Sequence, residues 1–234
     1  MKKLFILLFL SLSLFVQSQE YNSLIIKQGK TIEEFVPKNW KIIYKSDGDL
    51  NKDKIKDVAF VIENTAKENF ILNDGLGGDT LNINPRFLLI LFKNELGYKL
   101  QSVNEDFIPS QNDAESTCLA DSFLQDGGME IINGILIINL RYWLSCGSWE
   151  VSDKVFKFKF QNNKFELIGY DSWNFHRASG EKNTESINFL TKKKQLVTGL
   201  NEFEESKPIT VWKNIKINKL LNLEELTADS EINF

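Results

Sequence analysis

The chain has 234 residues, of which 42% are hydrophobic and 26% charged, and this composition excludes a disordered or collagen-like protein. Its 28 basic and 32 acidic residues give a net charge of −4, so we expect no nucleic-acid partner. A single histidine excludes metal centres built from several histidines. The length suits one domain with a sizeable hydrophobic core.

Residues 1–18 have the form of an export signal. Lys2 and Lys3 precede an apolar run, LFILLFLSLSLFV, and Val16-Gln17-Ser18 resembles a cleavage site. We therefore expect residues 19–234 to be exported, either periplasmic or secreted. The apolar run is too short for a comfortable membrane anchor, and no cysteine near the cut offers a site for a lipid. No transmembrane span is expected after processing.

Short helices are expected near both ends of the mature chain. Thr31 and Glu34 have the spacing of a capping box, and Pro37 ends any helix that forms over residues 30–37. Residues 217–226, rich in leucine, predict a second short helix.

Between these segments the pattern is that of short strands. In one of them Phe156, Phe158 and Phe160 share one face while the intervening lysines share the other, as in a half-buried strand. The expected strands are 40–45, 57–63, 86–93, 97–103, 129–132, 135–143, 155–160, 164–170, 186–191, 195–199 and 209–213. We interpret the chain as one mainly β domain of antiparallel hairpins or a meander.

The turns between these strands support hairpins. Asn133-Gly134 is typical of a type I′ turn, which needs positive φ at both central residues, and Asn162-Asn163 tolerates the same conformation. The polar segments 64–85 and 104–128 are predicted to be loops, where functional sites are often found. No change in composition divides the chain into two domains.

The segment 46–63 contains an acidic loop with oxygen-bearing side chains at alternate positions. These are Asp49, Asn51, Asp53 and Asp57, and Ile55 is placed to offer its carbonyl oxygen. Ca²⁺ takes six to eight oxygen ligands, and alternate residues of an EF-hand-type loop turn inward to supply them. We therefore predict Ca²⁺ as a cofactor held by these five residues. The alternative is a solvated turn of mixed charge.

The loop and the strand after it resemble the FG-GAP or VCBS repeat, over residues 47–61. Gly48-Asp49-Leu50-Asn51-Lys52-Asp53 and the following Asp57-Val58-Ala59-Phe60-Val61 match the order of that repeat. The repeat has glycine where this chain has Lys54, and a left-handed residue other than glycine costs about 1 kcal/mol. No second acidic loop occurs in the sequence, which disfavours a repeat array such as a propeller.

More broadly, the chain resembles small exported bacterial proteins that carry one such repeat. The similar segments are 73–93, 147–171 and 186–194. That resemblance implies export and a β fold, and it implies no established enzymatic activity.

A disulfide between Cys118 and Cys146 is expected because an exported chain with two cysteines folds in an oxidising compartment. If Asn133-Gly134 is a two-residue turn, Cys146 lies opposite residue 121, close to Cys118. A bulge at Gly127-Gly128 can adjust this register. The alternative is two unpaired, buried thiols.

Four aromatic residues form a candidate binding platform for a glycan or a peptide: Tyr142, Trp143, Trp149 and Trp173. Arg141 and Arg177 accompany them. The alternative is that these rings belong to the β core.

Three further features carry less specific signals. The Gly-rich segment 73–79 lacks the order of a phosphate-binding loop and is expected to connect strands. His176 has no nucleophile motif beside it and is expected at the surface. Glu130, Glu150 and Glu166 are carboxylates whose spacing selects no catalytic pair, so we assign no catalytic residue.

Three functions remain open from the sequence. The first is an exported, non-enzymatic domain, stabilised by Ca²⁺, with a binding or envelope-associated role. The second is a module that binds a glycan or a peptide through an aromatic face, with a glycan or an envelope protein as the expected partner. The third is a hydrolase with an unrecognised pair of carboxylates.

Overall fold

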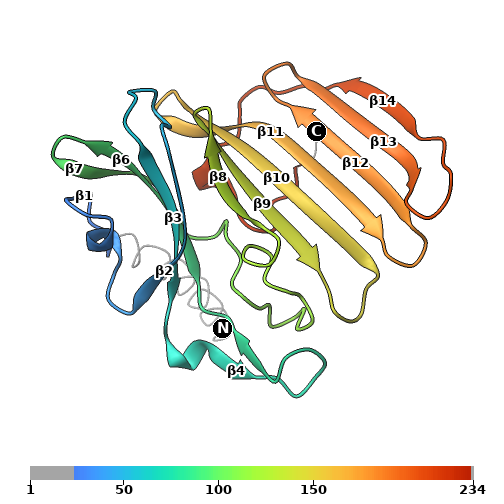
Figure 1. Cartoon of the computed structure of the whole chain (residues 1–234), viewed down its shortest axis with the longest axis horizontal. Helices are drawn as coiled ribbons and strands as arrows, with labels where there is room; N and C mark the ends of the chain where they lie inside the picture. Colours follow the sequence, from blue (N-terminus) through green and yellow to red (C-terminus); the bar gives the residue numbers. More distant parts are fainter. Residues whose placement is uncertain (1–23, 233–234) are drawn as a thin grey trace, which may run out of the picture.

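The computed structural model describes residues 24–232, so the proposed export signal lies outside the described residues. The chain is mainly β and antiparallel, as predicted, and forms two large sheets and a small hairpin (Figure 1). The five-stranded sheet has the order β1-β7-β6-β3-β2. Its strands are β1 (Gln28–Gly29), β2 (Trp40–Gly48), β3 (Asp57–Asn64), β6 (Arg86–Asn94) and β7 (Gly97–Asn104).

The seven-stranded sheet is a meander in which each strand pairs with the next one in sequence. Its strands are β8 (Gly128–Ile132), β9 (Ile135–Trp143), β10 (Glu150–Gln161), β11 (Lys164–His176), β12 (Glu181–Asn188), β13 (Lys193–Asn201) and β14 (Ile209–Asn214). The two predicted asparagine turns are confirmed, because both central residues of each have positive φ. These are Asn133-Gly134 and Asn162-Asn163.

The segment predicted as a loop over residues 64–85 contains a small hairpin, which corrects that prediction. Its strands are β4 (Phe70–Leu72) and β5 (Thr80–Asn82), and they are joined by the Gly-rich segment. The Asn73 side chain donates to the carbonyls of Leu76 and Gly78 and thereby closes that segment on itself. Gly77 has φ 102° and lies against the Thr117 carbonyl, so only glycine fits there.

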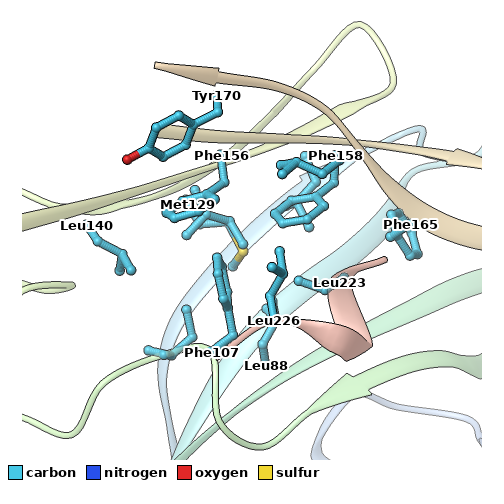
Figure 2. Close-up of a cluster of buried hydrophobic side chains, with 14 of the residues drawn as sticks. Leu88, Phe107, Met129, Leu140, Phe156, Phe158, Phe165, Tyr170, Leu223 and Leu226 are labelled. Atoms are coloured by element: carbon cyan, nitrogen blue, oxygen red, sulfur yellow. The ribbon is translucent and has the colours of Figure 1, made fainter. Parts of the chain in front are cut away.

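The main core lies between the two large sheets (Figure 2). Phe156 and Phe158 of β10 point into it from one side, and Leu88 of β6 lies on the other side. Phe107 comes from the loop after β7 and meets both phenylalanines edge to face. Such edge-to-face contacts suit the quadrupoles of aromatic rings and add to the hydrophobic stabilisation. The predicted alternation of the 155–160 strand is therefore confirmed.

A second core covers the outer face of the five-stranded sheet. Phe60 of β3 and Leu89 of β6 are fully buried there and pack with Phe35 of η1 and Trp40 at the start of β2. Neighbouring residues of β3 and β6 point to the main core instead, so both strands are buried on both faces. This explains why their sequences are continuously apolar and do not alternate.

The predicted terminal helices are not present as such. The N-terminal segment forms only the short 3-10 helix η1 (Glu33–Phe35), and the C-terminal segment forms only the 3-10 helix η3 (Leu223–Glu225). A third 3-10 helix, η2 (Lys67–Asn69), precedes β4. In the C-terminal segment, extended backbone at Leu221 accepts a hydrogen bond from Leu167 of β11. Pairing with a strand edge and burial of Leu223 and Leu226 in the main core outweigh the helical pattern.

No helix within residues 24–232 has the length and apolar character needed to cross a membrane.

Candidate functional site

The acidic loop joins β2 to β3 and is organised by its own side chains. Asp49 accepts the backbone N–H of Lys52 at 2.7 Å and that of Lys54 at 2.9 Å, one on each carboxylate oxygen. Asn51 accepts from the N–H of Asp53 at 2.9 Å. Asp53 accepts from the N–H of Ile55 at 2.7 Å. The alternate oxygen-bearing residues thus form successive turns in which each side chain caps the backbone that follows.

Asp57, at the start of β3, has a different environment from the other acidic residues. It is fully buried, and its Oδ2 accepts the N–H groups of Leu50 and Asn51 at 2.9 and 3.3 Å. Its Oδ1 accepts the N–H of Lys93 at 3.0 Å. Burial raises the pKa of this carboxyl, while the three backbone donors act in the opposite direction. Asp57 therefore ties the acidic loop to β6.

Leu50 anchors the same loop to the main core, where only 1% of its surface is exposed. On its solvent side, the loop lies beside the β8–β9 turn. A Cβ atom added to Gly134 of that turn would lie 3.4 Å from the carbonyl oxygen of Asp49. The acidic loop is consequently placed where the edges of the two sheets meet (Figure 1).

Lys54 has φ 73°, and Lys52 has φ 68°. The loop therefore turns sharply with a lysine in the left-handed region, at a cost of about 1 kcal/mol. The five predicted ligands, Asp49, Asn51, Asp53, Asp57 and the Ile55 carbonyl, have the oxygen chemistry that a calcium ion takes. Within residues 24–232, no three His, Cys, Asp or Glu side chains converge as a metal-holding group. The ligand atoms are thus of the type that calcium prefers, and calcium binding stays a prediction.

Cys118 and Cys146 form a disulfide with a Cα–Cα distance of 5.5 Å. The predicted register holds in the β8–β9 hairpin, where Ile132 pairs with Ile135 and Gly128 with Asn139. Beyond it the loop over residues 123–127 shifts the register by four residues, so that Leu119 pairs with Leu144. The bulge is larger than predicted, and it places Cys118 beside Cys146.

Three of the four predicted platform residues come together on one surface. Trp143 on β9 and Trp173 on β11 point outward from the face of the seven-stranded sheet that lies away from the main core. Trp149 lies in the loop after β9 and is 61% exposed. Tyr142 points to the opposite face, where it packs against the main core and donates to the Ala228 carbonyl at 3.3 Å. Burial and the nearby Asp229 raise the pKa of Tyr142 to about 12.

Arg177 joins two of these tryptophans. Its guanidinium carbon lies 5.3 Å from the ring centroid of Trp143 and 5.6 Å from that of Trp149. It also donates to the carbonyls of Leu144 and Ser148 at 2.8 and 2.6 Å. The Trp149 loop is therefore held by Arg177 on one side and by the disulfide on the other.

Trp173 is also flanked by cations. The guanidinium of Arg141 and the ammonium of Lys182 lie 5.6 and 5.3 Å from its ring centroid, within the range of cation–π attraction. Asp153 lies beside Trp173, and its buried Oδ1 has no hydrogen-bond partner among the described residues. Burial raises the pKa of Asp153, and Arg141 at 3.6 Å partly offsets this effect. We call this surface the aromatic face, defined by Arg141, Trp143, Trp149, Trp173, Arg177 and Lys182.

Sequence reasoning missed a buried ion cluster. Arg86 of β6, 1% exposed, contacts Glu63 of β3 at 2.8 Å and Asp121 at 2.6 Å. Burial alone lowers the pKa of Arg86, but its bonds to Asp121 and Glu63 outweigh this and raise it. The sequence does contain a signal for this cluster, because the apolar strands β3 and β6 carry Glu63 and Arg86 near one end. In the sheet these two residues are directly paired. Every charge in the cluster has a partner, which indicates a structural role.

The other chemical candidates do not assemble. His176 accepts the N–H of Ser179 at 3.1 Å within the β11–β12 turn, so its Nδ1 caps that turn. Glu150 and Glu166 lie at opposite ends of the β10–β11 pair. Glu130 is exposed on β8. These carboxylates do not form the close pair that glycoside cleavage requires.

Comparison with protein-family models, with curated proteins and with solved structures gives no match to this chain.

Proposed function

We propose that the chain is an exported, non-enzymatic binding domain that recognises a polypeptide partner through its aromatic face. The observation that carries the proposal is the position of Trp143, Trp149 and Trp173. They lie on one uncovered face of the sheet, and each has a cation stacked on its ring. Rings placed in this way are half-exposed or exposed and are not used by the core.

The chemistry of this face favours a protein ligand. Tryptophan and arginine are the residues most enriched in the energetic centres of protein interfaces. Arg177 uses its donors on backbone carbonyls, so it holds the rings in place and does not present a free charge. A glycan, the other ligand considered from the sequence, can also stack on tryptophan, and the experiment below separates the two.

The acidic loop supports this function indirectly. We propose that Ca²⁺, bound through Asp49, Asn51, Asp53, the Ile55 carbonyl and Asp57, stiffens the junction between the two sheets. Asp57 also holds the loop to β6. Extracellular and periplasmic proteins meet enough calcium for such a site. Export rests on the signal-like residues 1–18, and the partner would be secreted or in the cell envelope.

Selection from a displayed peptide library, with a glycan array in parallel, tests the proposal. Peptides selected on the native protein should lose about tenfold or more in affinity for Trp149→Ala and Trp173→Ala, as expected for interface centres. Leu96→Ala is the matched control, because Leu96 is 88% exposed on the β6–β7 turn of the other sheet. Binders that tolerate both tryptophan variants, or binding to glycans alone, would contradict a polypeptide ligand on this face.

A further inference from the structure

Strand β14 is an edge strand with an open hydrogen-bonding side. It pairs with β13 on one side only, in a regular antiparallel register. Just past its end, Ile215 donates its N–H to the Lys192 carbonyl at 3.0 Å. Hydrogen-bonded positions alternate along an antiparallel pair, so odd-numbered residues of β14 face β13. The backbone N–H and C=O groups of Thr210, Trp212 and Asn214 therefore point away from the sheet.

Two other edge strands, β8 and β2, are protected. β8, at the opposite end of the seven-stranded sheet, packs against β2, the edge of the five-stranded sheet (Figure 1). Their contact is tight, because Gly48 of β2 lies against Ile131 and Gly128 lies against Tyr44. An uncovered strand edge invites pairing with another chain, and proteins usually blunt it. Within residues 24–232 no segment pairs with the outer side of β14.

Apolar side chains are exposed along β14. Ile209 and Trp212 are each 63% exposed, and Val211 is also exposed. Ile209 and Val211 lie on one face of the sheet and Trp212 on the other, so apolar surface is uncovered on both faces of this edge.

Charge is distributed unequally along β14. The segment before it, residues 202–207, carries three glutamates and one lysine. The far end carries Lys213 and Lys216, with Lys192 of the β12–β13 turn and Lys193 of β13 beside them. A parallel neighbour would place like charges together. An antiparallel second copy of the same strand places the acidic end of each copy beside the basic end of the other.

We propose that the chain forms a two-fold symmetric dimer by antiparallel pairing of β14 with β14 of a second copy. With the two-fold axis at Trp212, residue 212 faces its own counterpart and Thr210 faces Asn214 of the other copy. All the outward backbone groups of both strands are then paired. Centring the axis on Val211 would place Pro208, which has no N–H, opposite Asn214 and lose hydrogen bonds.

The dimer has a consequence for the surface of the assembly. A two-fold axis perpendicular to the sheet keeps each face of the sheet on the same side in both copies. The two aromatic faces would therefore point the same way on one continuous sheet, with the two Trp212 rings between them. A partner with repeated binding segments could then be held at two places. The dimer itself rests on β14 alone and stands whether or not the aromatic face binds a polypeptide.

Disulfide trapping tests the register. The two native cysteines are paired with each other, so Trp212→Cys introduces the single free thiol of the described chain. Hydrogen-bonded antiparallel partners have Cα atoms about 5.5 Å apart, within disulfide range. Under mild oxidation Trp212→Cys should form a covalent dimer. The matched control Val211→Cys faces Lys213 of the other copy and should cross-link far less.

Sedimentation of the native protein from micromolar to millimolar concentration supplies the second measurement. We expect a reversible dimer that Thr210→Pro abolishes, since that substitution removes an outward N–H and no bond to β13. A thermal melt of Thr210→Pro establishes that its monomer is folded. A native protein that stays monomeric throughout, or equal cross-linking of the two cysteine variants, would overturn the proposal. A native protein that stays monomeric and pairs the β14 edge only with strands of other proteins would overturn it equally.

Discussion

Arg86 and Asp121 form a two-point ion pair between segments 35 residues apart, with Nη1–Oδ1 at 2.8 Å and Nη2–Oδ2 at 2.6 Å. Arg86 lies on β6 of the five-stranded sheet, and Asp121 lies in the long segment that leads to β8 of the other sheet. Arg86 also donates to the Pro109 carbonyl at 3.1 Å. One buried side chain thus holds the 104–128 segment against the five-stranded sheet.

We expect Arg86→Met to lower the free energy of unfolding by about 3–5 kcal/mol, because it leaves the carboxylates of Glu63 and Asp121 buried without their cation. Arg86→Lys should restore only part of this loss, since lysine lacks the two-pronged geometry. Urea unfolding measures both. Lys41→Ala is the control, because Lys41 contacts the same Glu63 but is 56% exposed and should cost less than about 1 kcal/mol. Equal losses for Arg86→Met and Lys41→Ala would contradict the role of the cluster.

Removal of the disulfide should destabilise the fold strongly. The bond joins residues 28 apart in sequence. The chain-entropy account gives about 3–4 kcal/mol for a loop of this size. Unfolding of the double variant Cys118→Ala/Cys146→Ala, compared with the native protein, tests this. The double variant should be insensitive to a reducing agent, whereas the native protein should lose stability in it. Alkylation of two thiols in the native protein would contradict the pairing.

Lys54→Gly should raise stability and strengthen calcium binding. Glycine adopts the φ of 73° found at this position without the cost of about 1 kcal/mol that lysine carries. Lys54→Ala is the matched control, because it removes the same charge and leaves the backbone cost. Thermal melts with millimolar calcium and with chelator measure both effects.

The same melts test the calcium site itself. Binding to the folded state alone stabilises by about 2.7 kcal/mol at a hundredfold excess over Kd. Asp53→Ala should abolish the difference between calcium and chelator while the fold persists without calcium. Identical melting of the native protein in both solutions would remove calcium from the account of this loop, which would then be a turn capped by its own side chains.

Asp153→Asn should change how stability depends on pH. Burial raises the pKa of Asp153 in the folded state, so the folded protein holds this proton more tightly than the unfolded chain. Protonated Asp153 therefore contributes its whole stabilisation of the fold at pH values below the ordinary aspartate pKa. This contribution is lost as the pH rises through the raised pKa of the folded state. The asparagine variant should be more stable than the native protein at neutral pH. A tenfold difference in proton affinity between the folded and unfolded states corresponds to about 1.4 kcal/mol.

That difference in stability should shrink on acidification and vanish once Asp153 is protonated in both states. Urea unfolding at a series of pH values measures it. Asp47→Asn is a suitable control, because Asp47 contacts Lys45 at 3.5 Å from an exposed position, 47% of its side chain being accessible, and it does not act on Asp153. A stability difference that stays constant with pH would contradict the raised pKa.

Local sequence patterns were sufficient for much of the fold. Residues 135–143 form β9 with the bounds that alternation predicted, and Asn133-Gly134 makes the expected turn. Most other strands were placed within a few residues. The exceptions are β10, which begins five residues earlier than predicted, β11, which ends six residues later, and β12, which begins and ends earlier. The two-residue strand β1 and the β4–β5 hairpin were missed, because segments of two or three residues carry too little alternation to be recognised. The prediction of terminal helices was wrong for a related reason, since burial and strand pairing decide the conformation of such short segments.

The sequence by itself determined the class of fold, the hairpin turns and the cysteine pairing, because each depends on residues that are close together in the chain or on their number. Only the tertiary structure decided which rings share a surface. Tyr142 and Trp143 are neighbours in sequence and lie on opposite faces of β9, one against the core and one on the aromatic face. Likewise, the pairing of Arg86 with Asp121 and the open edge at β14 follow from how the two sheets pack. Alternation along one strand specifies its two faces, but only the packing of the sheets specifies which face is covered.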